Sequence, residues 1–323
     1  MTRKMEFETS ASLYEAAEEL IKKGAYKNWQ DFLETCVRNQ LTLEVHGKRN
    51  VPLIEGRPVR MDFPMYKELG LNWDRESIKP ISPLSANLLR SEYMPFCNRI
   101  LPAKVASRVL CNVLDGMTSL ELRIFQETLW AIAQDLGHYL SSLDEIAGRS
   151  LRLEALSTAF PHDQRKNDLA TKQRFLSHFV GYIDSGGMAN GMMLSLGLAT
   201  INASGQIGIT EIGHEFALLR NPILDDRDCT EKDLEPTLSK EEAEMYLRIV
   251  NQRLQKEAKA MERMRIILAK GSQSYRTICE SFGSNFPESE GTQAQVSILL
   301  GRMRELMLVR VKQEGLKTHY ELR

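Results

Sequence analysis

Amide, hydroxyl and guanidinium side chains follow one another closely near the end of the chain. Gln293, Gln295 and Ser297 open an apolar-periodic stretch, and Arg302 and Arg304 lie further along it. An amide side chain can pair with the edge of adenine through two hydrogen bonds, and a guanidinium binds phosphate oxygens well. This order of residue types indicates a helix whose first turns reach the base edges of DNA.

More cations alternate with apolar residues immediately downstream. The segment LVRVKQEGLKTHYELR contains two alternating runs around Gln313-Glu314-Gly315, which predicts a β-hairpin. Alternation places Arg310 and Lys312 on one face of the first strand, and Lys317 and His319 lie on the returning strand. Because phosphate binding draws much of its affinity from counterion release, it requires lysine or arginine. We therefore expect phosphate contacts from Arg302, Arg304, Arg310, Lys312 and Lys317.

No arrangement of residues indicates a catalytic or metal site. The six histidines include no pair at a spacing such as H-E-x-x-H, and the chain has no G-x-S-x-G elbow and no phosphate-binding P-loop. The five cysteines are scattered without a C-x-x-C pair, which is typical of free thiols in a reducing compartment. We expect no enzyme activity, no cofactor and no metal, although nuclease carboxylates can lie far apart in sequence.

Composition limits where nucleic acid could bind. The chain has 323 residues, 42% of them apolar and 26% charged, which suits two or three globular domains. Its net charge is −1, so attraction for nucleic acid must come from a local patch, and residues 241–323 carry 14 basic and 11 acidic residues. The opening MTRKMEFET has no apolar signal run, and no stretch approaches the roughly 18 apolar residues of a membrane span. We expect a cytoplasmic protein that does not enter a membrane.

The C-terminal region predicts three helices before its hairpin. Residues 239–270 have the pattern of a long charged helix that ends with Glu262–Lys270, and shorter helices are predicted for Tyr275–Phe282 and Thr292–Leu306. Three helices followed by a two-stranded hairpin resemble the winged helix, and TQAQVSILLGRMRELMLVRV is similar to the recognition helix and first wing strand of winged-helix regulators. The resemblance implies that the third helix enters the major groove of DNA and that the hairpin, or wing, flanks it.

An earlier stretch has the same order of helices and hairpin but carries no charge. Residues 101–220 predict long helices, including two at 150–160 and 168–184, and LGLATINASGQIGITEIG then predicts a small hairpin and a further helix. This stretch looks like the end of another winged helix, so the expected fold class is mainly α with short β-hairpin wings, arranged as tandem winged-helix domains. Gly186–Thr210 has no charged residue, which argues against DNA contact there. The helix GGMANGMMLSLG indicates the core or a protein partner at Met188, Met192 and Met193.

The remaining regions are smaller. Residues 1–44 predict a strand at Lys4–Glu8 and two helices separated by KKGAYKNWQDF, which resembles a ribbon-helix-helix module and implies an intertwined homodimer. The outward Glu6 and Glu8 are unfavourable opposite phosphate. Six of the eleven prolines lie in residues 45–100, with a seventh at Pro102, which indicates a connector. Residues 221–238 are expected to be an acidic linker, with six acidic and two basic residues between 225 and 235.

One function and two alternatives follow from these patterns. We expect a homodimeric, sequence-specific DNA-binding protein of the transcriptional-regulator class. Its C-terminal winged helix, residues 239–323, would contact double-stranded DNA, and its first, residues 101–220, would serve assembly. One alternative is a winged-helix scaffold subunit that binds a protein partner and no DNA. The other is a replication initiator, which also uses two winged helices, one to dimerise and one to read DNA repeats.

Overall fold

The computed structural model divides the chain into two compact units, Met1–Asp62 and Phe63–Arg323. It describes residues 11–22, 28–30, 32–33, 69–89, 92–94, 96–146, 155–162, 169–225, 237–283, 292–314 and 317–323. The predicted strand Lys4–Glu8, residues 45–68 and most of the acidic linker lie outside the described residues. Each unit is considered by itself below.

In the first unit, helix α1 (Ala11–Lys22) confirms the first of the two helices predicted there. Tyr14 of α1 stacks on Trp29 with 4.7 Å between the ring centroids, and Trp29 meets Phe32 edge-on at 5.8 Å. The Phe32 amide donates to the Asn28 carbonyl at 3.1 Å, the spacing of a helical turn. These aromatic contacts hold α1 against a second helical turn. The ribbon-helix-helix assignment stays a prediction.

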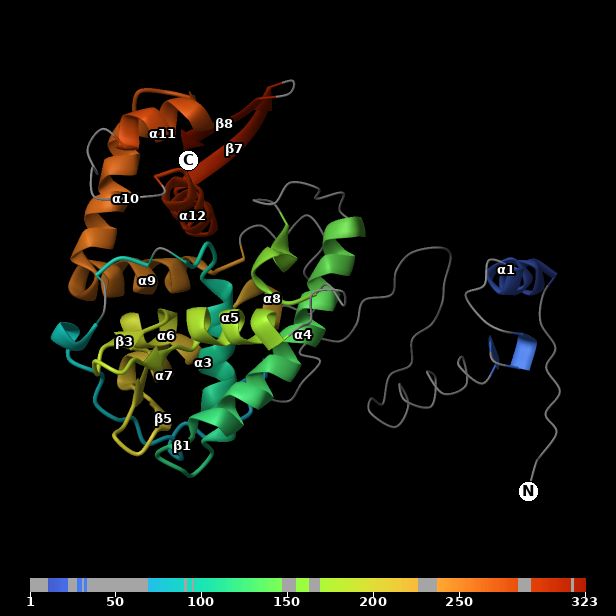
Figure 1. Ribbon diagram of the computed structural model, residues 1–323, viewed down its shortest axis with the longest axis horizontal. Coiled ribbons are helices and arrows are strands. Elements are labelled where there is room, and N and C mark those ends of the chain that lie inside the picture. Colours follow the sequence, from blue (N-terminus) through green and yellow to red (C-terminus); the bar gives the residue numbers. More distant parts are fainter. Residues whose placement is uncertain are drawn as a thin grey trace. The chain divides into compact units, whose positions relative to one another are not determined.

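The second unit is mainly helical, with small antiparallel sheets (Figure 1). Its α-helices are α3 (Leu101–Val113), α4 (Leu122–Ile146), α5 (Leu169–Phe179), α6 (Met192–Ser195), α7 (Glu211–Leu218), α8 (Pro222–Asp225), α9 (Lys240–Arg253), α10 (Gln255–Leu268), α11 (Tyr275–Gly283) and α12 (Thr292–Glu305). Two 3₁₀ turns are η2 (Ala86–Leu88) and η3 (Leu156–Ala159). The strands are β1 (Leu120–Glu121), β2 (Tyr182–Ile183), β3 (Ala189–Asn190), β4 (Ala199–Ile201), β5 (Gln206–Ile209), β6 (Gln273–Ser274), β7 (Val309–Glu314) and β8 (Lys317–Leu322).

Two segments of this unit repeat one topology, and we call them the first module, residues 101–209, and the second module, residues 255–322. Each begins with a helix, α3 or α10, followed by a left-handed glycine, Gly116 (φ 75°) or Gly271 (φ 109°). A two-residue strand then leads directly into the next helix, and a later hairpin closes the module. The short strand pairs with the second hairpin strand in both, giving the orders β1-β5-β4 and β6-β8-β7.

The helix before each hairpin also ends in the same way. The Leu198 amide donates to the Met193 carbonyl at 2.8 Å, and the Leu308 amide donates to the Met303 carbonyl at 2.8 Å. The residue before each leucine is left-handed, with φ 69° at Gly197 and 60° at Met307. Both ends are Schellman-type caps, which satisfy the last helix carbonyls through a residue in this conformation. The modules are therefore structural repeats, although the sequence shows no repeat of fixed period.

Met307 is the only non-glycine residue with positive φ among the described residues, and this leads to a stability prediction. A side chain in the left-handed region costs roughly 1–2 kcal/mol, which glycine avoids. We expect Met307→Gly to raise the free energy of unfolding by up to about 1 kcal/mol, measured by urea denaturation. Gly197→Ala is the matched control and should destabilise, because its Cβ would lie 2.8 Å from the Arg253 guanidinium. A less stable Met307→Gly protein would contradict the prediction.

Three predicted helices differ from the observed ones for local reasons. The long helix expected over residues 239–270 breaks at Leu254 (φ −123°, ψ 67°), whose side chain is buried, and becomes α9 and α10. Of the helix expected at 150–160, the described residues 155–160 hold the 3₁₀ turn η3, in which the Asp144 carboxylate accepts the Leu156 and Ser157 amides at 2.8 and 2.9 Å. The helix expected over 168–184 ends at Phe179, two residues before the left-handed Gly181.

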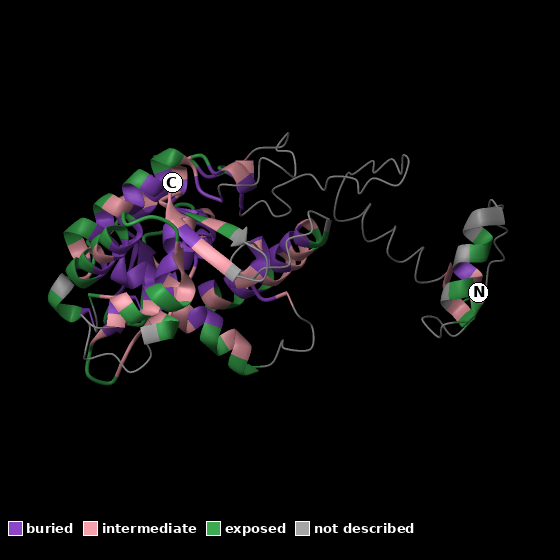
Figure 2. Cartoon of the chain, turned by 90° about the horizontal axis from the view of Figure 1, so that it is seen from above, coloured by how far each residue is buried: buried purple, intermediate pink, exposed green. Residues whose placement is uncertain are grey.

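A single apolar core runs through the second unit, from Leu69 to Tyr320. Buried residues fill its interior and exposed ones lie on the outer faces of the helices (Figure 2). The core includes several residues from the region predicted to be a connector, among them Trp73, Ile78, Met94 and Cys97. The described residues between 69 and 100 are thus part of the compact body, and the expected domain boundary at residue 100 does not coincide with the division between the units.

Candidate nucleic-acid interface

The hairpin β7–β8 presents the cations that the sequence analysis placed on it. In the antiparallel register Arg310 lies opposite Glu321 and Lys312 opposite His319. Arg310 and Lys312 are exposed, while Val309 and Tyr320 are buried, so one face of the hairpin meets the core and the other meets solvent. Lys312 keeps 53% of its side chain exposed although its ammonium pairs with the Glu321 carboxylate at 2.7 Å. Exposed pairs of this kind are weak, so phosphate can displace the carboxylate.

The predicted base-reading residues in the first turns of α12 differ in how exposed they are to solvent. Gln293 is exposed, whereas Gln295 and Ser297 are half-buried. The Tyr275 hydroxyl at the start of α11 donates to the Gln293 carbonyl at 2.5 Å, which joins the two helices. Burial raises the pKa of Tyr275 to about 12, so this phenol remains a donor at neutral pH. Gln293 is the residue of this set whose side chain is most accessible to a base edge.

The prediction that Arg302 contacts phosphate is wrong, because its side chain is fully buried. Its Nε donates to the Glu257 carboxylate at 2.9 Å, and its guanidinium also donates to the carbonyls of Met94, at 3.0 Å, and Cys97. Burial acts most strongly and lowers the pKa of Arg302, but the Glu257 carboxylate together with Tyr246, Tyr93 and Cys97 outweighs it and holds the pKa above its ordinary value. Arg302 is a permanent internal cation whose donors face protein acceptors, so it cannot bind phosphate in this structure.

The other predicted cations differ in accessibility. Arg304 is half-buried on α12 and acts to lower the pKa of Tyr320, a phenol whose pKa burial nevertheless raises. Lys317 lies on β8 opposite Glu314, and its side chain lies outside the described residues. Sequence reasoning missed Arg276, which is exposed on the first turn of α11 and pairs with Glu280 at 2.9 Å. The signal for Arg276 was its position at the start of the helix that precedes the expected recognition helix.

The equivalent surface of the first module contains no cation. Helix α6 is fully buried, so it cannot enter a groove of DNA in this structure. Met192 and Met193 are 0% exposed and belong to the core, which corrects their assignment to a partner surface, while Met188 is half-buried. The hairpin tip, residues 202–206, is exposed but uncharged. The first module therefore has no group on its hairpin suited to phosphate.

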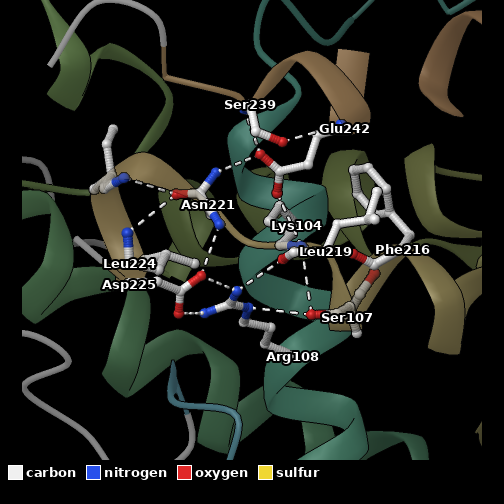
Figure 3. A network of polar contacts seen from close by, with 12 residues as sticks. Lys104, Ser107, Arg108, Phe216, Leu219, Asn221, Leu224, Asp225, Ser239 and Glu242 are labelled. Atoms are coloured by element: carbon white, nitrogen blue, oxygen red, sulfur yellow. Dashed lines mark hydrogen bonds and ion pairs between the residues drawn. The ribbon is translucent and has the colours of Figure 1, made fainter. Parts of the chain in front are cut away.

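A buried ionic network ties α3 to the segments around α7, α8 and α9 (Figure 3). The Lys104 ammonium pairs with Glu242 at 2.8 Å and donates to the carbonyls of Phe216 and Leu219, both at 2.5 Å. One turn along α3, Arg108 pairs with Asp225 and donates to the Leu219 carbonyl at 2.9 Å. Cations favour a helix C-terminus because its last carbonyls carry partial negative charge. This network is structural and is closed to solvent.

Neither a metal centre nor a membrane segment occurs in the part of the chain that the structure describes. No group of three or more histidine, cysteine or acidic side chains is arranged to hold a metal ion there. No described helix combines the length and apolar character needed to cross a membrane. Comparisons with protein families, with curated proteins and with solved structures find no match to this chain. The functional assignment therefore depends on geometry and charge alone.

Proposed function

We propose that this chain is a tandem winged-helix protein that binds double-stranded DNA through its second module, as a sequence-specific regulator. The observation that carries the proposal is the pair of exposed cations, Arg310 and Lys312, on the outer face of the hairpin β7–β8. A flanking wing contacts the DNA backbone, and backbone contact requires such cations. Arg304, Lys317 and Gln293 are the further contacts proposed here, and Arg302 is not one of them.

The topology of the second module supports the same assignment. Its order is helix α10, short strand β6, helices α11 and α12, and then the hairpin, with β6 pairing with β8. Three helices followed by a two-stranded wing is the arrangement expected of a winged helix, with α12 in the place of the recognition helix. The first module has the same leading helix, short strand and closing hairpin, with α5 and the β2–β3 pair inserted between α4 and α6, which supports the tandem arrangement.

Removing the two wing cations tests the proposed function. We expect Arg310→Ala/Lys312→Ala to weaken binding to a labelled mixed-sequence duplex, measured by fluorescence anisotropy. Each phosphate contact contributes a slope of about 0.9 to the dependence of log affinity on log salt, which corresponds to roughly tenfold per cation near 0.1 M salt. The double variant should therefore lose on the order of 50- to 100-fold in affinity.

The matched control removes two exposed cations from another face of the same module. Lys256 and Lys259 are exposed on α10, the helix that begins the module. Lys256→Ala/Lys259→Ala makes the same change in net charge, so it should change affinity by less than about threefold if the wing is the contact. Equal losses from the two double variants would contradict a specific role for the wing.

The uncharged first hairpin favours a second candidate, a replication initiator whose first winged helix dimerises. The two modules share one topology, but only the second has cations on its hairpin. A division between an assembling module and a DNA-reading module would produce this contrast. Cooperative binding to tandem DNA repeats, with a dimer seen by light scattering, would select this candidate over a regulator. A scaffold without DNA binding would instead show no salt-dependent retention on heparin.

A further inference from the structure

One stripe of α12 should face away from the core of its own module. Val296, Leu299, Leu300 and Met303 are buried at helical spacing and pack into that core. The opposite stripe consists of Ala294, Ile298, Gly301 and Glu305, and a helix lying in a major groove would present this stripe to DNA. Along the stripe Ala294 is exposed, Ile298 is half-buried, and Gly301 and Glu305 are buried. Its C-terminal half is therefore covered.

The cover is the chain immediately before α3, which we call the junction segment, residues 92–94 and 96–100. A Cβ added at Gly301 would lie 2.7 Å from the Asn98 carbonyl oxygen, so the backbone of the segment touches the helix. The Glu305 carboxylate accepts the amides of Ile100 and Leu101, the latter at 3.1 Å, at the beginning of α3. Thr237 also donates to Glu305, at 2.8 Å.

These contacts pair buried polar groups of α12 with the junction segment and the start of α3, and separating them would cost free energy. Burial raises the pKa of the Glu305 carboxyl, while the first amides of α3, at the positive end of that helix, stabilise its carboxylate form. Arg302 satisfies the carbonyls of Met94 and Cys97, and Glu257 accepts the Met94 amide at 3.2 Å. Pulling the segment away would leave several buried donors and acceptors unpaired. The junction is thus built as a permanent contact, in contrast to a cover that opens readily.

From this geometry we infer that α12 stays docked when DNA binds. The DNA surface is then the hairpin β7–β8, with Arg304 beside Tyr320 of β8, together with the first turn of α12. The fitting partner is duplex DNA whose backbone follows the wing. Base reading is confined to the exposed first turn at Gln293, while the second half of α12 serves as the joint between the two modules. This inference rests on the proposed function and specifies its binding surface.

Variants that weaken the junction distinguish docked binding from a mechanism in which α12 must leave the junction segment before DNA binds. Gly301→Ala forces the Asn98 carbonyl to shift, and Glu305→Gln replaces one of the two carboxyl oxygens that accept the α3 amides without a large change in volume. We expect the affinity of each variant for duplex DNA, measured by anisotropy on the full chain, to stay within about twofold of wild type. A gain of tenfold or more would show that the junction inhibits binding and would overturn the inference.

Amide hydrogen exchange on the wild-type chain gives a second test that does not depend on how the variants fold. The amides of Ile100 and Leu101 donate to Glu305, so their protection reports the docked state. We expect saturating duplex DNA to leave their protection unchanged and to increase protection along β7 and the first turn of α12. Faster exchange at Ile100 and Leu101 upon addition of DNA would overturn the inference.

The outcomes also separate failure of the inference from failure of the proposed function. If wild type does not bind duplex DNA in a salt-dependent way, the proposed function fails and the binding surface fails with it. If wild type binds but DNA releases the Ile100 and Leu101 amides, the function stands and docked binding is wrong. Binding with the junction protected supports both.

Discussion

Replacing Arg302 with methionine should destabilise the folded chain by about 3–5 kcal/mol, the range found when one partner of a buried ion pair is removed. Both side chains of the Arg302–Glu257 pair are 0% exposed. The variant would leave the Glu257 carboxylate with the Met94 amide, at 3.2 Å, as its donor, and would leave the carbonyls that accept from Arg302 without that partner. Urea denaturation followed by circular dichroism measures the loss. On this account Arg302 stabilises the fold and does not contact DNA. After correction for the unfolded fraction, the variant should bind DNA with the affinity of wild type.

Two comparisons make the Arg302 result specific. Arg304→Met removes a half-buried arginine two residues along the same helix and should cost less than about 1 kcal/mol. Arg302→Met/Glu257→Gln removes the unpaired charge and keeps an acceptor for the Met94 amide, so it should recover part of the lost stability. Equal costs for Arg302→Met and Arg304→Met would contradict the burial of Arg302.

Replacing Lys104 with methionine should produce a loss of similar size, about 3–5 kcal/mol, for a different reason. The Lys104 ammonium directs its hydrogens at Glu242 and at the carbonyls of Phe216 and Leu219, so it satisfies the end of α7 as well as a carboxylate. Burial lowers the pKa of Lys104 to about 8, which leaves it charged at neutral pH. Methionine would fill the space but leave Glu242 without its cation, as the arrangement in Figure 3 makes clear.

The Lys104 prediction has its own controls. In wild type the Asn221 amide donates to the Glu242 carboxylate at 2.8 Å. Lys104→Met/Glu242→Gln should recover part of the stability, because the glutamine oxygen can still accept from Asn221. Lys240→Met, at an exposed lysine, should change stability by less than about 0.5 kcal/mol. Since the folded pKa of about 8 lies below the unfolded value of 10.5, the unfolded chain binds more protons between these pH values. The stability of wild type relative to Lys104→Met should therefore rise from pH 8 to 10.5, and a fall would contradict the assigned pKa.

Local patterns were enough to predict the elements that form the wing. Alternation over residues 309–322 predicted the hairpin, and apolar spacing with a Gly-Thr start predicted α12. These signals are local because a strand or helix sorts its side chains by its own period. The pattern of the Met-rich helix left the core and a protein partner open for Met192 and Met193, and burial places both in the core. The mainly helical fold with short hairpins followed from the same periodicities.

The parts that sequence could not show depend on residues distant along the chain. Arg302 and Arg304 are the same residue type two positions apart on α12, but Arg302 contacts Glu257 and the junction segment, while Arg304 is half-buried. The cations of α3 are a similar case, since Lys104 and Arg108 are satisfied by carbonyls more than a hundred positions later. The shared order of helices and hairpin was visible in the sequence, but the shared left-handed cap was not, because Gly197 and Met307 adopt it with different residue types.

The salt dependence of DNA binding tests the central claim most directly. With Arg304, Arg310, Lys312 and Lys317 as the phosphate contacts, wild type should show a slope of about −3.6 in a plot of log affinity against log salt concentration. Arg310→Ala/Lys312→Ala should reduce the magnitude of that slope by about 2, because each lost phosphate contact removes about 1. The same slope in wild type and in the double variant, or no salt-dependent binding at all, would contradict a DNA-binding wing.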